Sequence, residues 1–80
     1  MKLEQLLNRA WDNTQGIKDK YQRQIHVVLI MMGYSDPSSA SSRQWGYACD
    51  VLNEIPCTNY QSDKLWIGDC MRSYWDKEHR

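Results

Sequence analysis

Three cysteines and two histidines are the residues of this chain with the most distinctive chemistry. Structural zinc sites usually pair their ligands about two to four residues apart in the sequence. The cysteines here are spaced eight and thirteen positions apart, which does not predict a metal site. Two of them fall on predicted apolar helix faces, where a free cysteine packs as a small hydrophobic side chain. The residues are His26, Cys49, Cys57, Cys70 and His79; Cys49 and Cys70 are those expected to be packed, and Cys57 alone is expected to be a reactive thiol.

No set of residues forms a recognisable catalytic motif. The chain contains no nucleophile elbow, no phosphate-binding glycine loop and no paired-carboxylate site. His26 lies away from the main apolar stripe of its predicted helix, so we expect its imidazole to be solvated. Because no nucleophile, base and orienting group can be named together, we predict a protein that is not an enzyme and uses no cofactor.

A second set of polar residues favours nucleic-acid binding as an alternative. A helix that ends at Gly33, a short turn and a helix that opens at Ser38 would form a helix-turn-helix. Small polar side chains with Arg and Gln suit the N-terminus of a recognition helix, and nearby Lys and Arg could contact phosphates. The net charge of zero, from ten basic and ten acidic residues, weakens this alternative. Its candidate residues are Lys18, Lys20, Arg23, Ser41, Arg43 and Gln44.

Nine of the 80 residues are Trp or Tyr, and none is Phe. Five of these aromatic residues fall on predicted core faces: Trp11, Tyr21, Trp45, Tyr74 and Trp75. The other four do not fit the main apolar stripes. Trp, Tyr and Arg dominate binding energy at protein interfaces, so side chains left outside the core are candidates for partner contact. The predicted partner-binding residues are Tyr34, Arg43, Tyr47, Tyr60, Leu65 and Trp66.

The apolar periodicity predicts the helices that position these side chains. Leu3, Leu6, Leu7, Ala10 and Trp11 give one amphipathic face, and residues 17–32 give a second helix that stops at Gly33. This second helix has two apolar stripes, so it must be central in the bundle or meet another chain. If it meets another chain, a homodimer would form through Val27, Ile30, Met31 and Tyr34. The β-branched residues of 25–30 leave a buried strand, Ile25–Ile30, as the alternative in a small α+β fold.

Helix-start signals precede the last two predicted helices. Asp36 and Pro37 suit the start of a third helix. The serine-rich stretch 38–42 has poor helix propensity, so this helix is expected to begin late. Its apolar stripe runs up to Pro56. Ser62 is a plausible cap for the last helix. Gly46 and Gly68 fall inside these helices, where each costs about 1 kcal/mol relative to Ala, and we expect close backbone packing at both.

These patterns predict an all-α fold, a compact bundle of three to four short helices in a single domain over residues 1–80. An 80-residue chain has little room for a deep pocket and its supporting shell. An odd number of cysteines does not form a closed disulfide framework, and the N-terminus has no apolar signal region. The longest apolar run, Val27–Met32, is too short to span a bilayer. We therefore expect a cytoplasmic protein, in the host cytoplasm if the source is viral.

The expected function is that of a small non-enzymatic protein-binding module. It would act sterically, as an inhibitor or adaptor on a larger protein or nucleoprotein assembly. Small chains without a catalytic motif include many phage-encoded inhibitors of host machinery, such as anti-CRISPR proteins, and this class is expected from the size of the chain and its lack of a catalytic motif. The alternative is a helix-turn-helix-like nucleic-acid-binding regulator, and no membrane partner is expected.

Overall fold

The computed structural model describes residues 2–34, 36–58 and 60–78. These residues form four α-helices and one short 3₁₀ helix: α1 (Leu3–Asn13), α2 (Lys20–Met31), η1 (Pro37–Ser39), α3 (Ser42–Leu52) and α4 (Asp63–Glu78). The predicted all-α bundle is therefore confirmed. The α+β alternative is wrong, because Ile25–Ile30 lies inside α2 and the described residues contain no strand.

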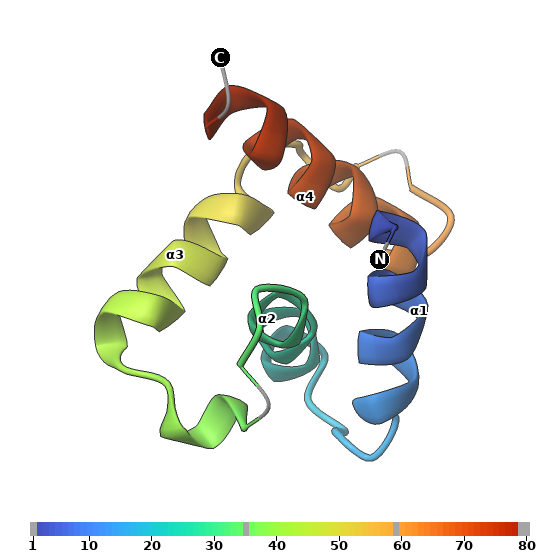
Figure 1. Ribbon diagram of the computed structural model, residues 1–80. Coiled ribbons are helices and arrows are strands. Elements are labelled where there is room, and N and C mark those ends of the chain that lie inside the picture. The colour runs from blue at the N-terminus through green and yellow to red at the C-terminus, as the bar shows by residue number, and fades with distance from the viewer. Residues whose placement is uncertain (1, 35, 59, 79–80) are drawn as a thin grey trace.

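Helix α2 is the centre of the bundle. Figure 1 shows it end-on, with α1, α3 and α4 arranged around it. Val27, Val28 and Leu29 are completely buried, so consecutive positions of α2 face different neighbours. A helix covered on several sides needs more than one apolar stripe, and this explains the double stripe in the sequence.

The second stripe of α2 does not form a surface seam between copies of the chain. Val27 is completely buried and Met31 is 8% exposed, while Ile30 and Tyr34 pack against the same core. The expected homodimer seam is therefore wrong in its placement, because the bundle itself covers these side chains.

The ends of α2 are fixed by capping. At its start, the Asp19 carboxylate accepts hydrogen bonds from the backbone N–H groups of Tyr21 and Gln22 at 2.9 and 3.0 Å, so the helix begins after Ile17 rather than at it. At its end, Gly33 has a φ of 105°. Its N–H donates to the Ile30 carbonyl, and the next N–H donates to the Leu29 carbonyl, which is the Schellman arrangement. The predicted stop at Gly33 is confirmed.

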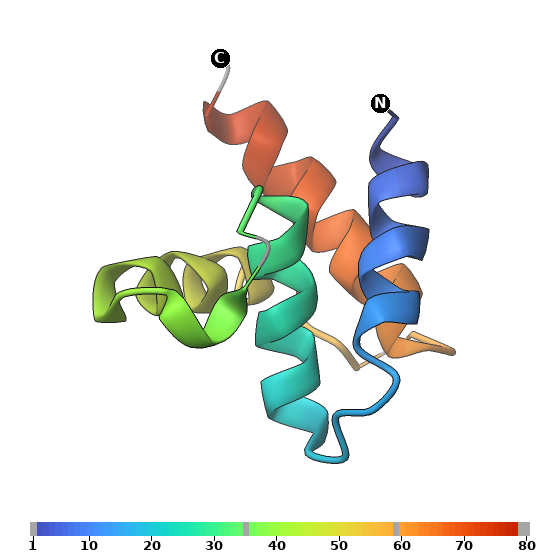
Figure 2. The same ribbon diagram turned by 60° about the horizontal axis from the view of Figure 1, so that its bottom comes forward.

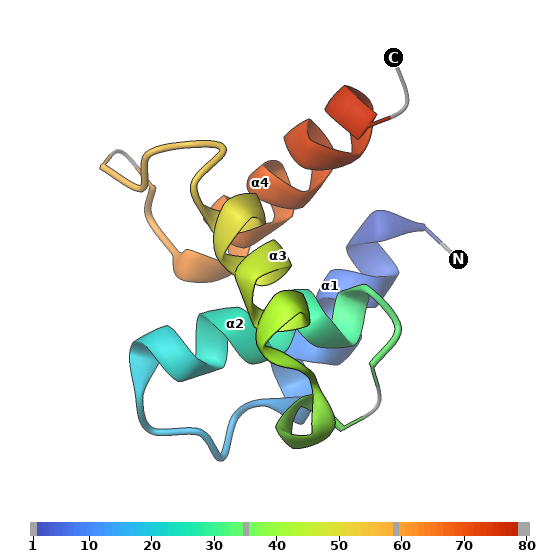
Figure 3. The same cartoon turned by 90° about the vertical axis from the view of Figure 1, so that its left-hand side faces the viewer.

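The connection from α2 to α3 is longer than a helix-turn-helix allows. It spans residues 32–41 and contains η1, which Asp36 organises by accepting from the Ser38 hydroxyl at 2.6 Å and the Ser38 N–H at 3.1 Å. A helix-turn-helix joins its helices through about three or four residues. Figures 2 and 3 show α3 crossing α2 steeply. The expected short turn is therefore wrong, whereas the expected late start of the third helix is confirmed.

Helices α1 and α4 pack as an antiparallel pair. Figure 2 shows the start of α1 and the end of α4 at the same end of the molecule. A Cβ atom placed on Gly68 would lie 2.8 Å from Cδ2 of Leu7, so the missing side chain lets α1 approach α4. The same atom on Gly46 would meet nothing within 4 Å, so the expected close packing is confirmed at Gly68 and wrong at Gly46.

Candidate functional site

The six predicted partner-binding residues are not brought together on one surface. Arg43, Tyr47 and Leu65 are exposed, the last two at 41% and 57%. Tyr34 and Tyr60 are half-buried and pack against the core. Tyr47 belongs to α3, whereas Leu65 lies in the first turn of α4 beside α1. A contact surface must therefore be identified from the exposed side chains themselves.

Trp66 is buried rather than exposed, which corrects its predicted place at the surface. It is 7% exposed, and its indole N–H donates to the Ile55 carbonyl at 2.6 Å. This bond fastens the connection between α3 and α4 to the core. The polar tip of Trp66 thus satisfies a backbone carbonyl, which is the usual requirement for burying an indole.

Tyr60 and Tyr34 are half-buried, and their hydroxyl groups face polar neighbours within the chain. Burial raises the pKa of Tyr60, and the adjacent carboxylate of Asp69 raises it further. The Tyr34 hydroxyl accepts a hydrogen bond from the side-chain amide of Gln44 at 2.8 Å. Both tyrosine side chains therefore contribute mainly to packing and polar contacts within the bundle.

Two aromatic residues predicted for the core are exposed instead. Tyr21 is 76% exposed and Trp75 is 58% exposed. Tyr21 lies in the first turn of α2 and Trp75 in the last turn of α4. Both corrections have the same cause, because the ends of these helices are covered by fewer neighbouring elements than their middles. The exposed Trp75 thereby becomes a candidate contact residue.

Two adjoining hollows beside the contact of α1 with α4 contain the exposed Trp75 and the exposed Leu65. Two hollows of about 320 and 510 Å³ adjoin there and share Leu3 and Arg72 in their linings. Leu65 lies in the larger hollow and Trp75 in the smaller one. We call this surface the α1–α4 furrow; its described lining is Leu3, Glu4, Leu6, Leu7, Asn8, Met31, Ser62, Lys64, Leu65, Gly68, Asp69, Met71, Arg72 and Trp75.

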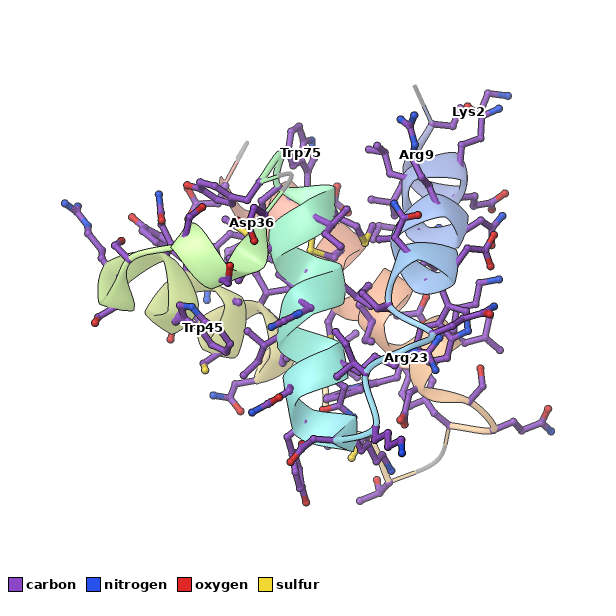
Figure 4. All side chains as sticks on the ribbon, turned by 90° about the horizontal axis from the view of Figure 1, so that it is seen from below. Lys2, Arg9, Arg23, Asp36, Trp45 and Trp75 are labelled. Carbon is purple, nitrogen blue, oxygen red and sulfur yellow. The ribbon has the colours of Figure 1, made fainter. Side chains whose placement is uncertain are left out.

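The two ends of the α1–α4 furrow are set by one helix. Leu65 and Trp75 are ten residues apart in α4, which corresponds to about 15 Å along the helix axis. In Figure 4, Trp75 lies toward the same edge of the molecule as Lys2, which precedes α1. On α4, Leu65, Gly68, Arg72 and Trp75 follow a stripe at i, i+3, i+7 and i+10 that faces α1, with Gly68 buried and the other three exposed. This stripe was the available sequence signal, but Trp75 was assigned to the core instead.

The charges along the furrow balance one another. Glu4 and Asp69 are acidic, and Lys64 and Arg72 are basic. The Arg72 guanidinium lies 3.8 Å from the Asp69 carboxylate, an exposed pair one helical turn apart. Such a pair contributes about 0 to 1 kcal/mol to stability. The furrow therefore combines apolar side chains with balanced charges and has no strong preference for a charged ligand.

Most of the side chains assigned to the nucleic-acid alternative interact with other groups of the same chain. The Arg23 side chain faces α1 (Figure 4). It donates hydrogen bonds to the Trp11 carbonyl at 2.9 Å and to the Thr14 hydroxyl at 3.2 Å. Its guanidinium also lies 3.6 Å from the centre of the Trp11 ring. Ser41 and Gln44 form the capping box of α3. Lys20 lies 3.6 Å from the carboxylate of Asp63. Lys18 and Arg43 remain as exposed basic side chains.

The histidine and cysteines have surroundings that differ in part from those predicted. His26 is half-buried, and its ring forms a T-shaped pair with Trp45 at 5.6 Å between ring centres, so its expected solvation is wrong. Cys49 is exposed rather than packed, Cys57 is exposed, and Cys70 is buried. No group of three or more described His, Cys, Asp or Glu residues is placed to hold a metal ion, and His79 lies outside the described residues.

The comparisons with known proteins leave the site to be interpreted from its geometry. Among the described helices, none has the length and apolar character needed to cross a membrane. No protein-family model matches the chain, and no significant match was found among curated proteins or solved structures.

Proposed function

We propose that the protein is a small non-enzymatic binding module whose α1–α4 furrow holds an amphipathic helix of a partner protein. The observation that carries this proposal is the pair of exposed anchors, Leu65 and Trp75, at 57% and 58% exposure, in two adjoining hollows that share Leu3 and Arg72. Large apolar side chains exposed beside a well-formed groove are characteristic of interaction surfaces.

The shape and composition of the furrow favour a helical partner segment. An extended peptide usually adds to the edge of a sheet, and the described residues contain no strand to receive it. A groove between two antiparallel helices instead suits the apolar face of a third helix. Met31 and Met71 line the furrow near Trp75, and flexible methionine side chains adapt readily to a docked helix. The 15 Å between the anchors corresponds to about three turns of such a helix.

The mode of action that follows is steric. The balanced charges of the furrow supply little long-range attraction, so affinity would come from burying apolar surface. A compact bundle bound to a partner helix would cover whatever surface that helix presents in its own assembly. The protein would then act as an inhibitor or as an adaptor, according to what the helix normally contacts.

The test is affinity capture from the native cell with quantitative mass spectrometry, using Leu65→Ala, Trp75→Ala and a control. Tyr21→Ala is the matched control, because Tyr21 is more exposed than either anchor and lies outside the furrow. Truncating a central anchor commonly costs about 2 kcal/mol or more, so each furrow variant should retain about one-thirtieth or less of the partner. Melting temperatures of all four proteins are measured in parallel, so that a loss of capture is assigned to the furrow only for a variant that is folded at the capture temperature.

The captured partner then has to be shown to bind through a helix. Cross-linking the complex identifies the partner segment that lies at the furrow. A synthetic peptide covering this segment should gain helical circular dichroism on binding and should compete with the full partner. Equal capture by all four proteins would refute the furrow as the binding site. A bound segment that stays extended would refute the helical partner.

A further inference from the structure

A second cleft, lined by residues of α2, α3, α4 and the α3–α4 connection, contains both exposed thiols. It has a volume of about 550 Å³, and Cys49 and Cys57 are both in its lining. None of the described lining residues is charged. We call it the thiol cleft; it is lined by Tyr21, Gln24, Ile25, Cys49, Leu52, Asn53, Ile55, Pro56, Cys57 and Trp66.

The two thiols of the thiol cleft come from different parts of the chain: Cys49 lies in α3, and Cys57 lies in the connection that follows it. The Ile55 carbonyl is held by the Trp66 indole at 2.6 Å. The Cys70 sulfur lies 3.8 Å from that carbonyl and 4.0 Å from the Leu52 carbonyl, so residues 52 and 55 meet at one sulfur atom. Cys49 precedes Leu52 by one helical turn on the cleft side of α3, and Cys57 follows the fastened Ile55 by two residues.

The third thiol is separated from the other two by the protein interior. Cys70 is completely buried beneath the α3–α4 connection. Burial raises the pKa of its thiol, which keeps the sulfur protonated and poorly nucleophilic. Cys49 and Cys57, by contrast, are open to solvent and share a cleft.

We propose that Cys49 and Cys57 are a redox pair that closes to an intramolecular disulfide across the thiol cleft. The oxidant is a hydroperoxide, and the thiolate of one cysteine attacks its terminal oxygen. This step breaks the O–O bond, releases water or an alcohol and leaves a sulfenic acid. The second thiolate attacks the sulfenic sulfur and displaces hydroxide, which takes up a proton and leaves as water. Two thiols are oxidised to one disulfide, and the hydroperoxide is reduced by two electrons.

The bond would tie the α3–α4 connection to the last turn of α3. Pro56, Cys57 and Thr58 are all exposed and follow Ile55, whose carbonyl is held by the Trp66 indole. A disulfide requires Cα atoms within about 7 Å of one another, so the proposal requires Cys57 to reach Cys49 within this limit. Closing the short loop restricts the unfolded chain, so the oxidised protein should melt at a higher temperature than the reduced one.

The test is mass spectrometry of the intact, reduced protein after treatment with hydrogen peroxide at low protein concentration. The oxidised monomer should lose the mass of two hydrogen atoms, and iodoacetamide added in denaturant should then label Cys70 alone. Trypsin leaves both cysteines in one peptide because no Lys or Arg lies between them. Cleavage after Glu54 separates them, so the two resulting fragments should stay linked until dithiothreitol is added.

Single variants distinguish this pair from unrelated oxidation. Cys49→Ser and Cys57→Ser should each abolish the linked fragments and the rise in melting temperature. Serine at either position changes an exposed side chain, so both variants should fold. Recovery of both thiols as labelled cysteines, or disulfide-linked dimers as the sole product, would overturn the proposal. A link that includes Cys70 would overturn it as well.

Discussion

Gly46 and Gly68 both lie inside helices next to or near a Trp, but only Gly68 has a close neighbour where a Cβ atom would be. A Cβ atom on Gly46 meets nothing within 4 Å, so Gly46→Ala should raise the free energy of unfolding by about 1 kcal/mol through helix propensity alone. A Cβ atom on Gly68 would press on Cδ2 of Leu7 at 2.8 Å, and Leu7 is buried. The Leu7 side chain must then shift, so Gly68→Ala should be clearly less stable than Gly46→Ala. Urea unfolding measures both changes, and equal stabilisation by the two variants would contradict the close approach of α1 to α4.

The tryptophans show what a residue pattern can and cannot predict. Trp66 flanks the predicted core face, yet it is buried because the connection after α3 passes over it and supplies the Ile55 carbonyl. Trp75 lies on the predicted core face, yet it is 58% exposed because it is in the last turn of α4. Periodicity identifies the face of a helix, but coverage depends on where the neighbouring elements end. For this reason Leu65 was identified as a contact residue and Trp75 was not.

At the scale of elements, the start of α3 depends on a local cap rather than on packing. The Ser41 hydroxyl accepts from the Gln44 N–H at 3.3 Å, and the Gln44 side chain accepts from the Ser41 N–H at 2.7 Å. Ser41→Ala should therefore lower the free energy of unfolding by about 1 kcal/mol. Ser42→Ala is the matched control, because Ser42 is exposed in the first position of α3 and lies outside the capping box. Chemical unfolding should show a loss for Ser41→Ala only, and equal effects would mean that the box contributes little.

Helix ends that rest on local chemistry were predictable, and connections that rest on tertiary contacts were not. Gly33 and Ser62 were identified because a positive φ and a side-chain cap are properties of the residue itself. The ten residues between α2 and α3 were misjudged as a short turn because η1 is held by Asp36 as a separate unit. This length, together with the capping roles of Ser41 and Gln44, removes the geometric basis of the helix-turn-helix prediction.

At the scale of the molecule, one central helix explains both the core and the binding surfaces. Because α2 is covered by α1, α3 and α4, most of its apolar side chains are buried in the bundle, whereas Tyr21 and Met32 near its ends are exposed. The α1–α4 furrow and the thiol cleft both lie at the margins of this core. The described linings of the furrow and the cleft have no residue in common. A furrow variant should therefore leave thiol oxidation unchanged, and the two proposals can fail separately.

The stability of the whole molecule should fall in alkaline solution. Burial raises the pKa of Cys70 above its ordinary value of 9.0, and burial likewise raises the pKa of Tyr60 and Tyr74 above 10.0. Between the ordinary and the raised pKa of each group, the folded protein holds a proton that the unfolded chain has lost. The folded state then binds more protons than the unfolded state, so the free energy of unfolding decreases as pH rises. These groups leave stability constant at neutral pH, where both states are protonated.

The decline should have two stages, because the thiol and the phenols titrate in different ranges in the unfolded chain. Urea unfolding from pH 7 to pH 11 should show a first loss near pH 9, from Cys70, and a steeper loss above pH 10, when Tyr60 and Tyr74 contribute. Cys70→Ala supplies the control: whatever its stability at pH 7, it should lack the first stage and keep the second. A stability that rises with pH in this range, or a first stage that persists in Cys70→Ala, would contradict the buried, protonated state of this thiol.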